Sequence, residues 1–304
     1  MDMELFLRAL TLGAGYNSAL VTLGAALLGI TAGAIGCFVL LRRRAMVSDA
    51  ISHATLPGVG IAFIIMALAG GDGRFLPGLL LGAAASAGIG LLTVEWIVRR
   101  TRLHEDAAIG AVLSVAFGLG IVLLTVIQTL GIGKPAGLEG FLLGGAAAML
   151  YAEALTVLVS GAVLALCIAF LWRRMLLVAF DAGYAETLGV PTHRTDRIMM
   201  FLALAVTVIG LKIVGLILIV ALMIIPPVAA RFWTNRADHM IGIAAVMGGA
   251  ACYIGTAISA SGESLPTGAV IVLTATTLFT LSMLLAPTRG VLAHWLAWRR
   301  FQKV

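Results

Sequence analysis

Runs of about twenty apolar residues recur along almost the whole chain, and they constrain its fold more than any other feature. They fall at 17–41, 50–70, 76–98, 107–130, 153–172, 198–211, 213–230, 240–259 and 267–286. A bilayer core is about 30 Å thick, so a crossing helix needs roughly 20 apolar residues. The sequence therefore predicts one all-α transmembrane helical bundle over residues 1–304, with about nine spans, or eight if 198–230 forms a single helix.

Composition excludes other classes of protein. The chain is 61% apolar and only 11% charged, whereas soluble domains have roughly 45–50% and about 25%. A soluble domain, a disordered chain and a nucleic-acid-binding protein are therefore not expected, although the net charge is +6. The three cysteines lie in separate apolar runs without CxxC spacing, so neither a disulfide framework nor a zinc finger is indicated.

The basic residues predict the orientation, because lysine and arginine are enriched in cytoplasmic loops. With nine spans, sixteen of the 20 fall on one side: Arg42, Arg43, Arg44, Arg99, Arg100, Arg102, Arg173, Arg174, Arg194, Arg197, Arg231, Arg236, Arg289, Arg299, Arg300 and Lys303. The N-terminus is then external and the C-terminus cytoplasmic. Residues 1–15 are expected to lie in the membrane interface, and 181–196 and 287–304 are predicted to form a cytoplasmic loop and tail.

Motifs typical of enzymes are absent from the sequence. His104-Glu105 begins like a metalloprotease HExxH motif, but Ala108 occupies the position of the second histidine. The only Ser-Gly pair of interest, Ser261-Gly262, falls in an external loop, and Lys134 lacks the glycine and hydroxyl spacing of a P-loop. The chain is therefore expected not to be an enzyme, and any ATPase that drives it would be a separate chain.

The richest cluster of polar residues opens the second span. Asp49 and His53 are four residues apart, so on a helix their side chains project from one face, one turn apart. Oxygen and nitrogen ligands suit manganese, iron or zinc. The alternative is that Asp49 caps the helix and pairs with Arg42–Arg44, while His53 donates between helices. A metal site would also need ligands from other helices.

Two further segments break the apolar pattern. Pro226 and Pro227 interrupt the seventh span and predict a helix break, either a kink for packing or a flexible wall of a pathway. In the loop 181–196, Asp181 is a plausible N-cap and Gly189 followed by Pro191 ends a short amphipathic helix. That helix fits a groove in a cytoplasmic partner or lies in the membrane interface. Elsewhere, Gly29 and Gly33, like Gly78 and Gly82, have the four-residue spacing of close helix contacts.

The sequence resembles the membrane permeases of bacterial ATP-binding-cassette importers for zinc, manganese and iron. The strongest marker is DAISHATLPG at 49–58, preceded by a helix and a basic turn. Further matches are RLHEDAAIG at 102–110, GLEGFLLG at 137–144, LKIVGLILIVALMIIP at 211–226 and LPTGAVIV at 265–272. The resemblance covers nearly the whole chain, and the motifs are specific in combination.

The resemblance implies a multi-pass protein of the bacterial cytoplasmic membrane. Its expected partners are a second permease chain, two cytoplasmic ATP-binding subunits and an extracytoplasmic metal-binding protein, besides lipid. Asp49 and His53 become candidate metal contacts, Ala185, Glu186, Leu188 and Gly189 the coupling segment to the ATPase, and Pro226 and Pro227 part of the pathway.

No permanently bound cofactor is expected, and the cargo is a divalent metal. The segments at 49–58 and 137–150 are more similar to the manganese branch, with zinc or iron as the alternative. A second alternative is an ion-coupled secondary transporter that uses Asp49 and His53 as a proton relay and works without an ATPase. A membrane-embedded metalloenzyme would need more ligands than the sequence identifies.

Overall fold

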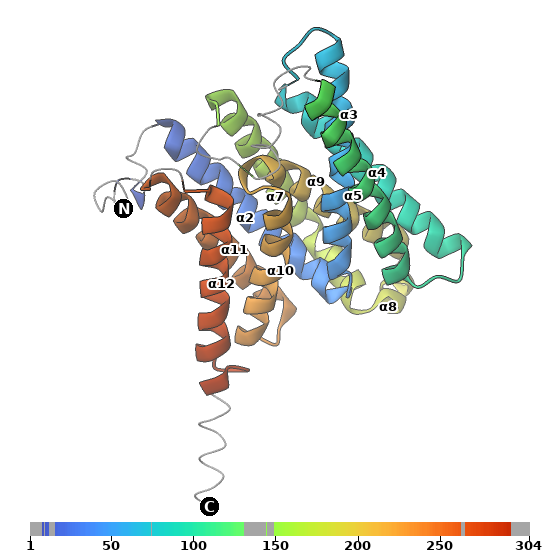
Figure 1. Cartoon of the computed structure of the whole chain (residues 1–304). Coiled ribbons are helices and arrows are strands. Elements are labelled where there is room, and N and C mark those ends of the chain that lie inside the picture. Colours follow the sequence, from blue (N-terminus) through green and yellow to red (C-terminus); the bar gives the residue numbers. More distant parts are fainter. Residues whose placement is uncertain are drawn as a thin grey trace, which may run out of the picture.

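The structure is a computed structural model that describes residues 8, 10–11, 16–73, 75–130, 144, 149–262 and 265–292. Within these residues the regular structure is entirely helical, as predicted (Figure 1). The helices are α2 (Tyr16–Leu41), α3 (Ala45–Leu68), α4 (Leu76–Arg100), α5 (Glu105–Leu130), α7 (Tyr151–Phe180), α8 (Ala182–Thr187), α9 (Thr192–Ile213), α10 (Leu216–Trp233), α11 (Ala237–Ala260) and α12 (Thr267–Leu285).

Seven of the described helices are long and apolar enough to cross a membrane individually, and the α9–α10 pair raises the number to eight if it forms one broken span. The polytopic helical bundle is thus confirmed, whereas the count of nine spans and the orientation of the termini stay predictions. Most of the interfacial segment 1–15, most of 131–148, Glu263 and the end of the tail, 293–304, lie outside the described residues.

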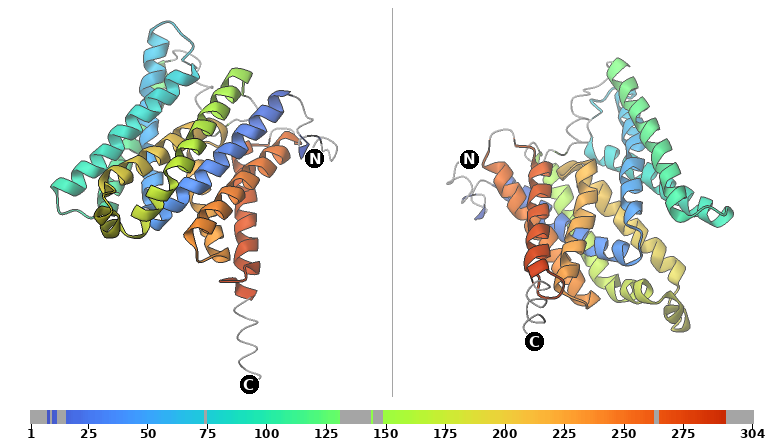
Figure 2. Two further views of the ribbon diagram at one scale, coloured as in Figure 1. Left: turned by 180° about the vertical axis from the view of Figure 1, so that it is seen from behind. Right: turned by 60° about the horizontal axis from the view of Figure 1, so that its bottom comes forward.

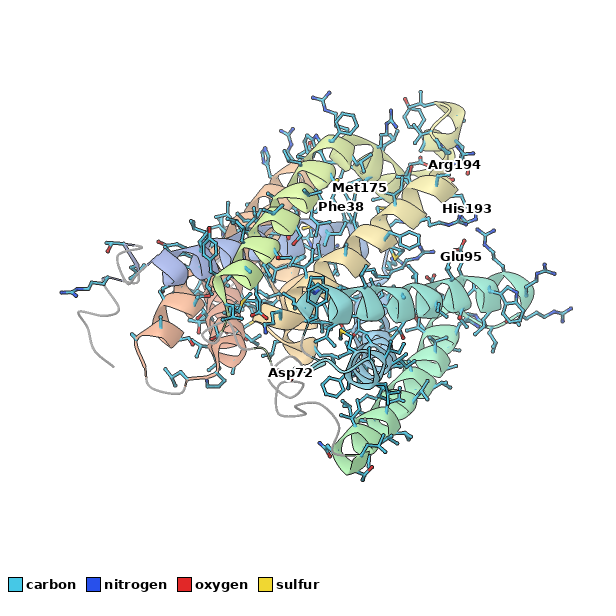
Figure 3. All side chains as sticks on the ribbon, turned by 90° about the horizontal axis from the view of Figure 1, so that it is seen from above. Phe38, Asp72, Glu95, Met175, His193 and Arg194 are labelled. Atoms are coloured by element: carbon cyan, nitrogen blue, oxygen red, sulfur yellow. The ribbon has the colours of Figure 1, made fainter. Side chains whose placement is uncertain are left out.

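Helix α2 is the central element of the bundle. It packs against α11, α7, α10 and α9 (Figure 2), and 72% of its membrane-length window is buried. Phe38 on α2 and Met175 on α7 are both completely buried (Figure 3). At the opposite extreme, only 17% of the corresponding window of α5 is buried, although α5 is strongly apolar. The large apolar surface of α5 is therefore available to lipid or to another membrane chain.

Helices α3, α4 and α5 pack on one another and form a group beside the helices that surround α2. Figure 2 shows this group standing to one side of the molecule. Both α9 and α10 contact α3, and α9 also contacts α4. The α9–α10 pair therefore connects the two groups of helices.

Close glycine contacts hold the helices together. A Cβ atom on Gly29 of α2 would lie 2.2 Å from the Gly248 carbonyl oxygen of α11, and one on Gly33 would lie 2.3 Å from the Ala244 carbonyl oxygen. The same kind of contact joins α3 to α4, since a Cβ atom on Gly58 would lie 2.0 Å from the carbonyl oxygen of Gly82. The predicted close packing at Gly29, Gly33 and Gly82 is confirmed, because only residues without side chains permit such approaches.

The predicted helices 198–211 and 213–230 correspond to α9 and α10, which meet at a bend of 120°. The break lies at Gly215, whose φ of 90° favours glycine. It does not lie at Pro226 and Pro227, because α10 stays helical through both prolines. The predicted boundary between 198–211 and 213–230 is therefore confirmed, whereas the separate break predicted at Pro226 and Pro227 does not interrupt α10.

Gly248→Ala should destabilise the protein by about 1–3 kcal/mol, as overpacked cores are, because the added methyl group would meet the Gly29 carbonyl oxygen at 2.2 Å. Gly242→Ala, on the same helix, is the matched control, because no atom lies within 4 Å of its Cβ position. Thermal unfolding of the purified variants measures both effects. Equal stability of the two variants would contradict the packing described for α2 and α11.

Candidate functional site

Asp49 and His53 lie on the first half of α3 and face each other. The Nε2 atom of His53 is 3.5 Å from the Oδ1 atom of Asp49, and their side chains are 20% and 44% exposed. The predicted one-turn spacing is therefore confirmed. His53 is the ninth residue of α3, so at 1.5 Å per residue it lies about 12 Å from the start of the helix. The pair is nearer to the end of the bundle where α3 begins than to the other end.

The alternative that Asp49 caps the helix and pairs with Arg42–Arg44 is wrong. The N-cap of α3 is Arg44, and the guanidinium groups of Arg42 and Arg44 bind Asp196 and Glu105 instead. Nor is His53 fully satisfied as an interhelical donor, because its Nδ1 atom is buried without a hydrogen-bond partner. A buried nitrogen without a protein partner calls for an explanation, such as a bound ion or water.

Neighbouring residues orient the imidazole ring of His53. Phe117 of α5 packs against it edge to face, with ring centroids 5.0 Å apart and an interplanar angle of 86°. Pro57 lies one turn further along α3 and has no N–H group, so it cannot donate the usual helical hydrogen bond to the His53 carbonyl. The hydroxyls of Ser48, Ser52 and Ser86 bind other carbonyls of the helix. The imidazole of His53 and the carboxylate of Asp49 therefore share one face of α3, and the His53 carbonyl lacks its usual helical N–H donor.

The pair does not form a complete metal site within one chain. Among the described residues, no group of three or more histidine, cysteine, aspartate or glutamate side chains is positioned to hold a metal ion. Two protein ligands are fewer than the four or more that divalent metals take in proteins. A metal bound at this pair would therefore need further ligands from outside the described side chains.

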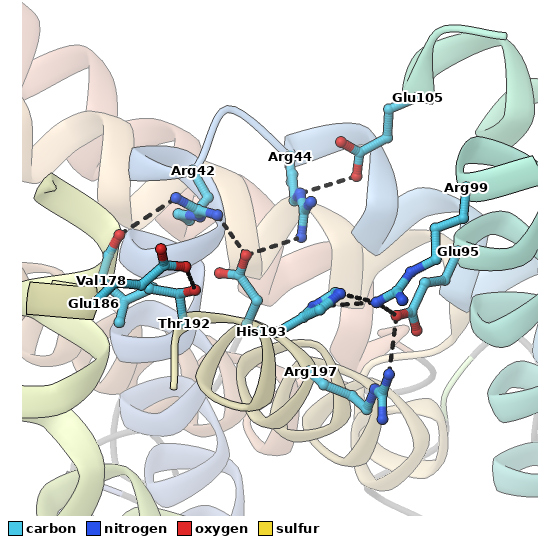
Figure 4. Close-up of polar contacts among 11 residues, drawn as sticks. Arg42, Arg44, Glu95, Arg99, Glu105, Val178, Glu186, Thr192, His193 and Arg197 are labelled. Carbon is cyan, nitrogen blue, oxygen red and sulfur yellow. Dashed lines mark hydrogen bonds and ion pairs between the residues drawn. The ribbon is translucent and has the colours of Figure 1, made fainter. Parts of the chain in front are cut away.

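An ionic cluster joins the helix ends close to the pair (Figure 4). Asp196, near the start of α9, accepts a hydrogen bond from Arg42 in the α2–α3 turn, and Arg42 also donates to the Val178 carbonyl oxygen of α7. Arg44 binds Glu105 of α5 with a nitrogen–oxygen distance of 2.9 Å. The Asp196 side chain is only 15% exposed. These bonds attach α9 to the turn that precedes Asp49 by a few residues.

A second ionic cluster joins α4 to α9. The Oε1 atom of Glu95 accepts from Arg99 at 2.6 Å and from Arg197 at 3.0 Å, and Arg99 also contacts His193. Figure 3 shows Glu95 on α4 and His193 at the start of α9 close to each other. Sequence reasoning did not single out Asp196, Glu105 or Glu95, although the carboxylate of Glu95 inside the apolar run 76–98 was a usable signal.

The short helix predicted in the loop 181–196 is confirmed as α8. The Asp181 side chain accepts a hydrogen bond from the Tyr184 N–H at 2.9 Å. At the other end, Gly189 has a φ of 76°, and the N–H groups of Gly189 and Val190 donate to the carbonyls of Glu186 and Ala185. These are the two bonds of a Schellman motif, in which glycine is preferred.

The predicted coupling residues differ in their environments. Ala185 of α8 is buried, whereas Leu188 and Tyr184 are 56% and 55% exposed. The carboxylate of Glu186 accepts from the Thr192 hydroxyl at 2.5 Å. Of these residues, Leu188 and Tyr184 expose apolar surface. Ala185 is buried, Glu186 joins α8 to α9, and Gly189 ends α8.

Pro226 and Pro227 lie where α10 packs on α2. Pro227 cannot donate to the Met223 carbonyl, and this carbonyl oxygen would lie 2.1 Å from a Cβ atom on Gly36. The freed carbonyl is therefore buried against the backbone of α2. This packing accounts for the prolines structurally, and their place along a pathway stays a prediction.

At the opposite end of α9, Lys212 forms an ion pair with Glu153 of α7, with 3.2 Å between Nζ and Oε1. The side chains are 20% and 16% exposed, and Glu153 also accepts from the Leu150 N–H at 3.2 Å. The charge of Glu153 is therefore balanced within the bundle by Lys212.

Comparison with known proteins gives concordant results. The model of a family described as "ABC 3 transport family" matches residues 17–286. The manganese transport system membrane protein MntC of Bacillus subtilis is 39% identical over 288 residues, which cover 94% of this chain and 65% of that protein. This chain thus spans about two thirds of the length of that relative. The zinc transport system membrane protein TroC of Treponema pallidum is 37% identical, with 94% of this chain and 93% of that protein covered.

A solved structure described as PsaBC from Streptococcus pneumoniae in complex with Fab has the same fold. One of its chains is 29% identical and superimposes with a TM-score of 0.81, covering 98% of this chain and all of that chain. An inward-facing structure of a putative metal-chelate type ABC transporter has a TM-score of 0.67 at 15% identity, which supports the fold alone.

Asp196→Asn should destabilise the protein by about 1–3 kcal/mol, because two arginines lose a charged acceptor in a largely buried position. Asp106→Asn is the matched control, since Asp106 is an exposed acid in the first turn of α5. Thermal unfolding of the purified protein measures the difference. Unchanged stability of Asp196→Asn would show that the cluster contributes little to joining α9 to the α2–α3 turn.

Proposed function

Because this chain belongs to the ABC 3 transport family, we propose that it is the membrane permease of an ATP-driven importer that carries manganese across the bacterial cytoplasmic membrane. The carrying observation is the half-exposed Asp49–His53 pair, with its buried and unpartnered imidazole nitrogen. Ionisable groups inside membrane helices are costly and usually mark an ion route. Asp49 and His53 are proposed as the metal contacts along this route.

A second copy of the permease is proposed to supply the missing ligands. The Asp49 side chain is 44% exposed. Further along α3, Ile61 and Ile65 are 46% and 62% exposed, although at 3.6 residues per turn they lie about 120° and 160° around the helix from Asp49. The adjacent helix α5 is also largely uncovered. If the Asp49–His53 pairs of two copies meet across a twofold axis, two carboxylates and two imidazoles converge. Four mixed oxygen and nitrogen ligands suit a divalent first-row metal.

Manganese is proposed as the cargo, with zinc or iron as the alternative within the same mechanism. The name of the Bacillus relative specifies manganese and that of the Treponema relative specifies zinc. An aspartate–histidine set without thiolate ligands fits either metal. The motif DAISHATLPG supports manganese by its resemblance to the manganese branch.

Coupling to ATP hydrolysis is proposed to run through α8. Tyr184 and Leu188 expose apolar surface there, and Glu186 joins α8 to the first residue of α9. The Asp196 cluster then joins α9 to the turn before Asp49. Closure of two cytoplasmic ATP-binding subunits would move α8 and α9 together, and would alter the surroundings of the metal pair. An extracytoplasmic binding protein is proposed to deliver the ion at the other end.

Asp49→Ala should reduce ATP-dependent uptake of labelled manganese by about tenfold or more, because loss of a ligand or its support weakens metal sites by 10–100-fold. The measurement uses cells that express the permease with its cognate ATPase and binding protein, and zinc and iron serve as competitors. Asp238→Ala is the control, because Asp238 is an acid at the start of α11, away from α3.

Uptake that survives in Asp49→Ala would show that the pair is structural, provided that the complex still assembles. Preferential entry of zinc or iron would overturn only the choice of metal. Uptake by this chain in membranes without any ATPase would overturn the ATP-driven mechanism and favour the secondary transporter.

Leu188→Asp should weaken retention of the ATPase subunits by roughly tenfold or more, since an apolar anchor at the centre of an interface often contributes 2 kcal/mol or more. Leu103→Asp is the matched control, because Leu103 is 51% exposed in the α4–α5 loop. Co-purification of the subunits with each permease variant measures the effect. Equal retention with both variants would exclude α8 as the main docking element.

A further inference from the structure

A cavity of about 250 Å³ lies between α3, α4, α5 and α9, and neither Asp49 nor His53 lines it. Its interior is apolar and includes Leu91 and Val94 of α4 and Met200 of α9. Leu92 and Phe201, which also line it, are 49% and 41% exposed. The cavity is therefore continuous with the apolar outer surface of α4 and α9.

Charged side chains line one end of the cavity. Arg99 and Arg197 share a single carboxylate oxygen of Glu95, and their side chains are 48% and 49% exposed. Each guanidinium carries five N–H donors, and the described contacts of Arg99 and Arg197 use one nitrogen of each. Most of the donors of this pair thus remain available to a ligand.

The surroundings of this end are strongly basic. The other lining carboxylates, Glu105 and Asp196, are already bound by Arg44 and Arg42. Three further exposed arginines flank Arg99 and Arg197 in the sequence: Arg100, Arg102 and Arg194. The end of α4 and the start of α9 therefore carry five arginines against two carboxylates, those of Glu95 and Asp196, and Asp196 is already bound by Arg42.

This combination matches the chemistry of an acidic amphiphile. Basic pockets between membrane helices at the cytoplasmic face bind acidic lipid head groups, and the guanidinium group fits phosphate oxygens in bidentate geometry. In the orientation predicted from the basic residues, these arginines face the cytoplasmic leaflet, whose surface is negative. The apolar interior beneath them suits an acyl chain.

We propose that an anionic phospholipid binds between α4 and α9, with its phosphate at Arg99 and Arg197 and part of an acyl chain in the cavity. The lipid would connect α4 to the helix that follows α8, and would thus add to the Glu95 cluster that already joins these elements. The inference depends on the membrane placement of the chain and not on the choice of metal. Its test is therefore independent of manganese transport.

The test is native mass spectrometry of the full-length permease, purified in detergent and titrated with phosphatidylglycerol or with phosphatidylcholine. The wild type should bind one phosphatidylglycerol more tightly than phosphatidylcholine. Arg99→Gln combined with Arg197→Gln should lower this affinity by roughly 25-fold, because each arginine near the lipid contributes about 1 kcal/mol and 1.4 kcal/mol is tenfold. Arg173→Gln combined with Arg174→Gln, exposed on α7, is the matched control.

Val98→Phe tests the cavity without changing charge, because Val98 lines it and is partly buried. The larger ring should exclude the acyl chain and lower the affinity for phosphatidylglycerol, while the protein stays monodisperse. This variant also tests the proposed lipid site if the double arginine variant does not fold. Full lipid binding by Val98→Phe would show that the cavity is not the binding site.

Three other results would overturn the proposal. Equal binding of phosphatidylglycerol and phosphatidylcholine would exclude recognition of an acidic head group. An equal loss of affinity in the Arg173 and Arg174 control would indicate general attraction to basic helix ends. Displacement of the lipid by an equal concentration of inorganic phosphate would show a phosphate site to which the acyl chain contributes nothing.

Discussion

Backbone polar groups in the hydrocarbon region have no water to bind, and the arrangement of this protein depends on that constraint. Among the described helices, two interruptions of a helix are covered by another helix. The Met223 carbonyl, which Pro227 deprives of its donor, lies against Gly36. The carbonyl of Val214, next to the break between α9 and α10, lies against Gly268. Glycines on the facing helices make this covering close enough, so helix breaks and glycine contacts occur together.

Hydrogen bonds and ion pairs connect the two ends of the proposed mechanism. Between the exposed Leu188 on α8 and the Asp49–His53 pair on α3, the connection consists of Glu186 with Thr192 and Asp196 with Arg42 and Arg44. The Glu186–Thr192 hydrogen bond is exposed, whereas the Asp196 side chain is only 15% exposed. In the proposed mechanism, a displacement of α8 would reach the α2–α3 turn through α9. Networks of hydrogen bonds and ion pairs are one means by which coupling energy passes between distant sites.

Much of this arrangement could be predicted from the sequence. The apolar runs identified the helices, and the spacing of Asp49 and His53, the N-cap at Asp181 and the turn at Gly189 are local patterns that depend on neighbouring residues. The Asp196, Glu105 and Glu95 clusters could not be assigned in this way, because each joins helices that are distant in the sequence. The boundary between α9 and α10 was predicted, but the second break expected at the prolines is absent for a related reason. Pro226 and Pro227 look like a break locally, but packing of the freed Met223 carbonyl on α2 lets α10 continue.

Asp49 differs from the acidic side chains that basic partners hold. Glu95, Glu105, Glu153 and Asp196 each bind an arginine or a lysine. A carboxylate held by a permanent cation is a poor ligand for a metal, because the metal must compete with the existing charge. The described ion-pair partner of Asp49 is His53, which in its neutral form is itself a metal ligand. A metal ion that replaced this contact would leave no arginine or lysine unpaired, so the proposed binding and release of cargo at the pair would not require the ionic clusters that hold the helices to break.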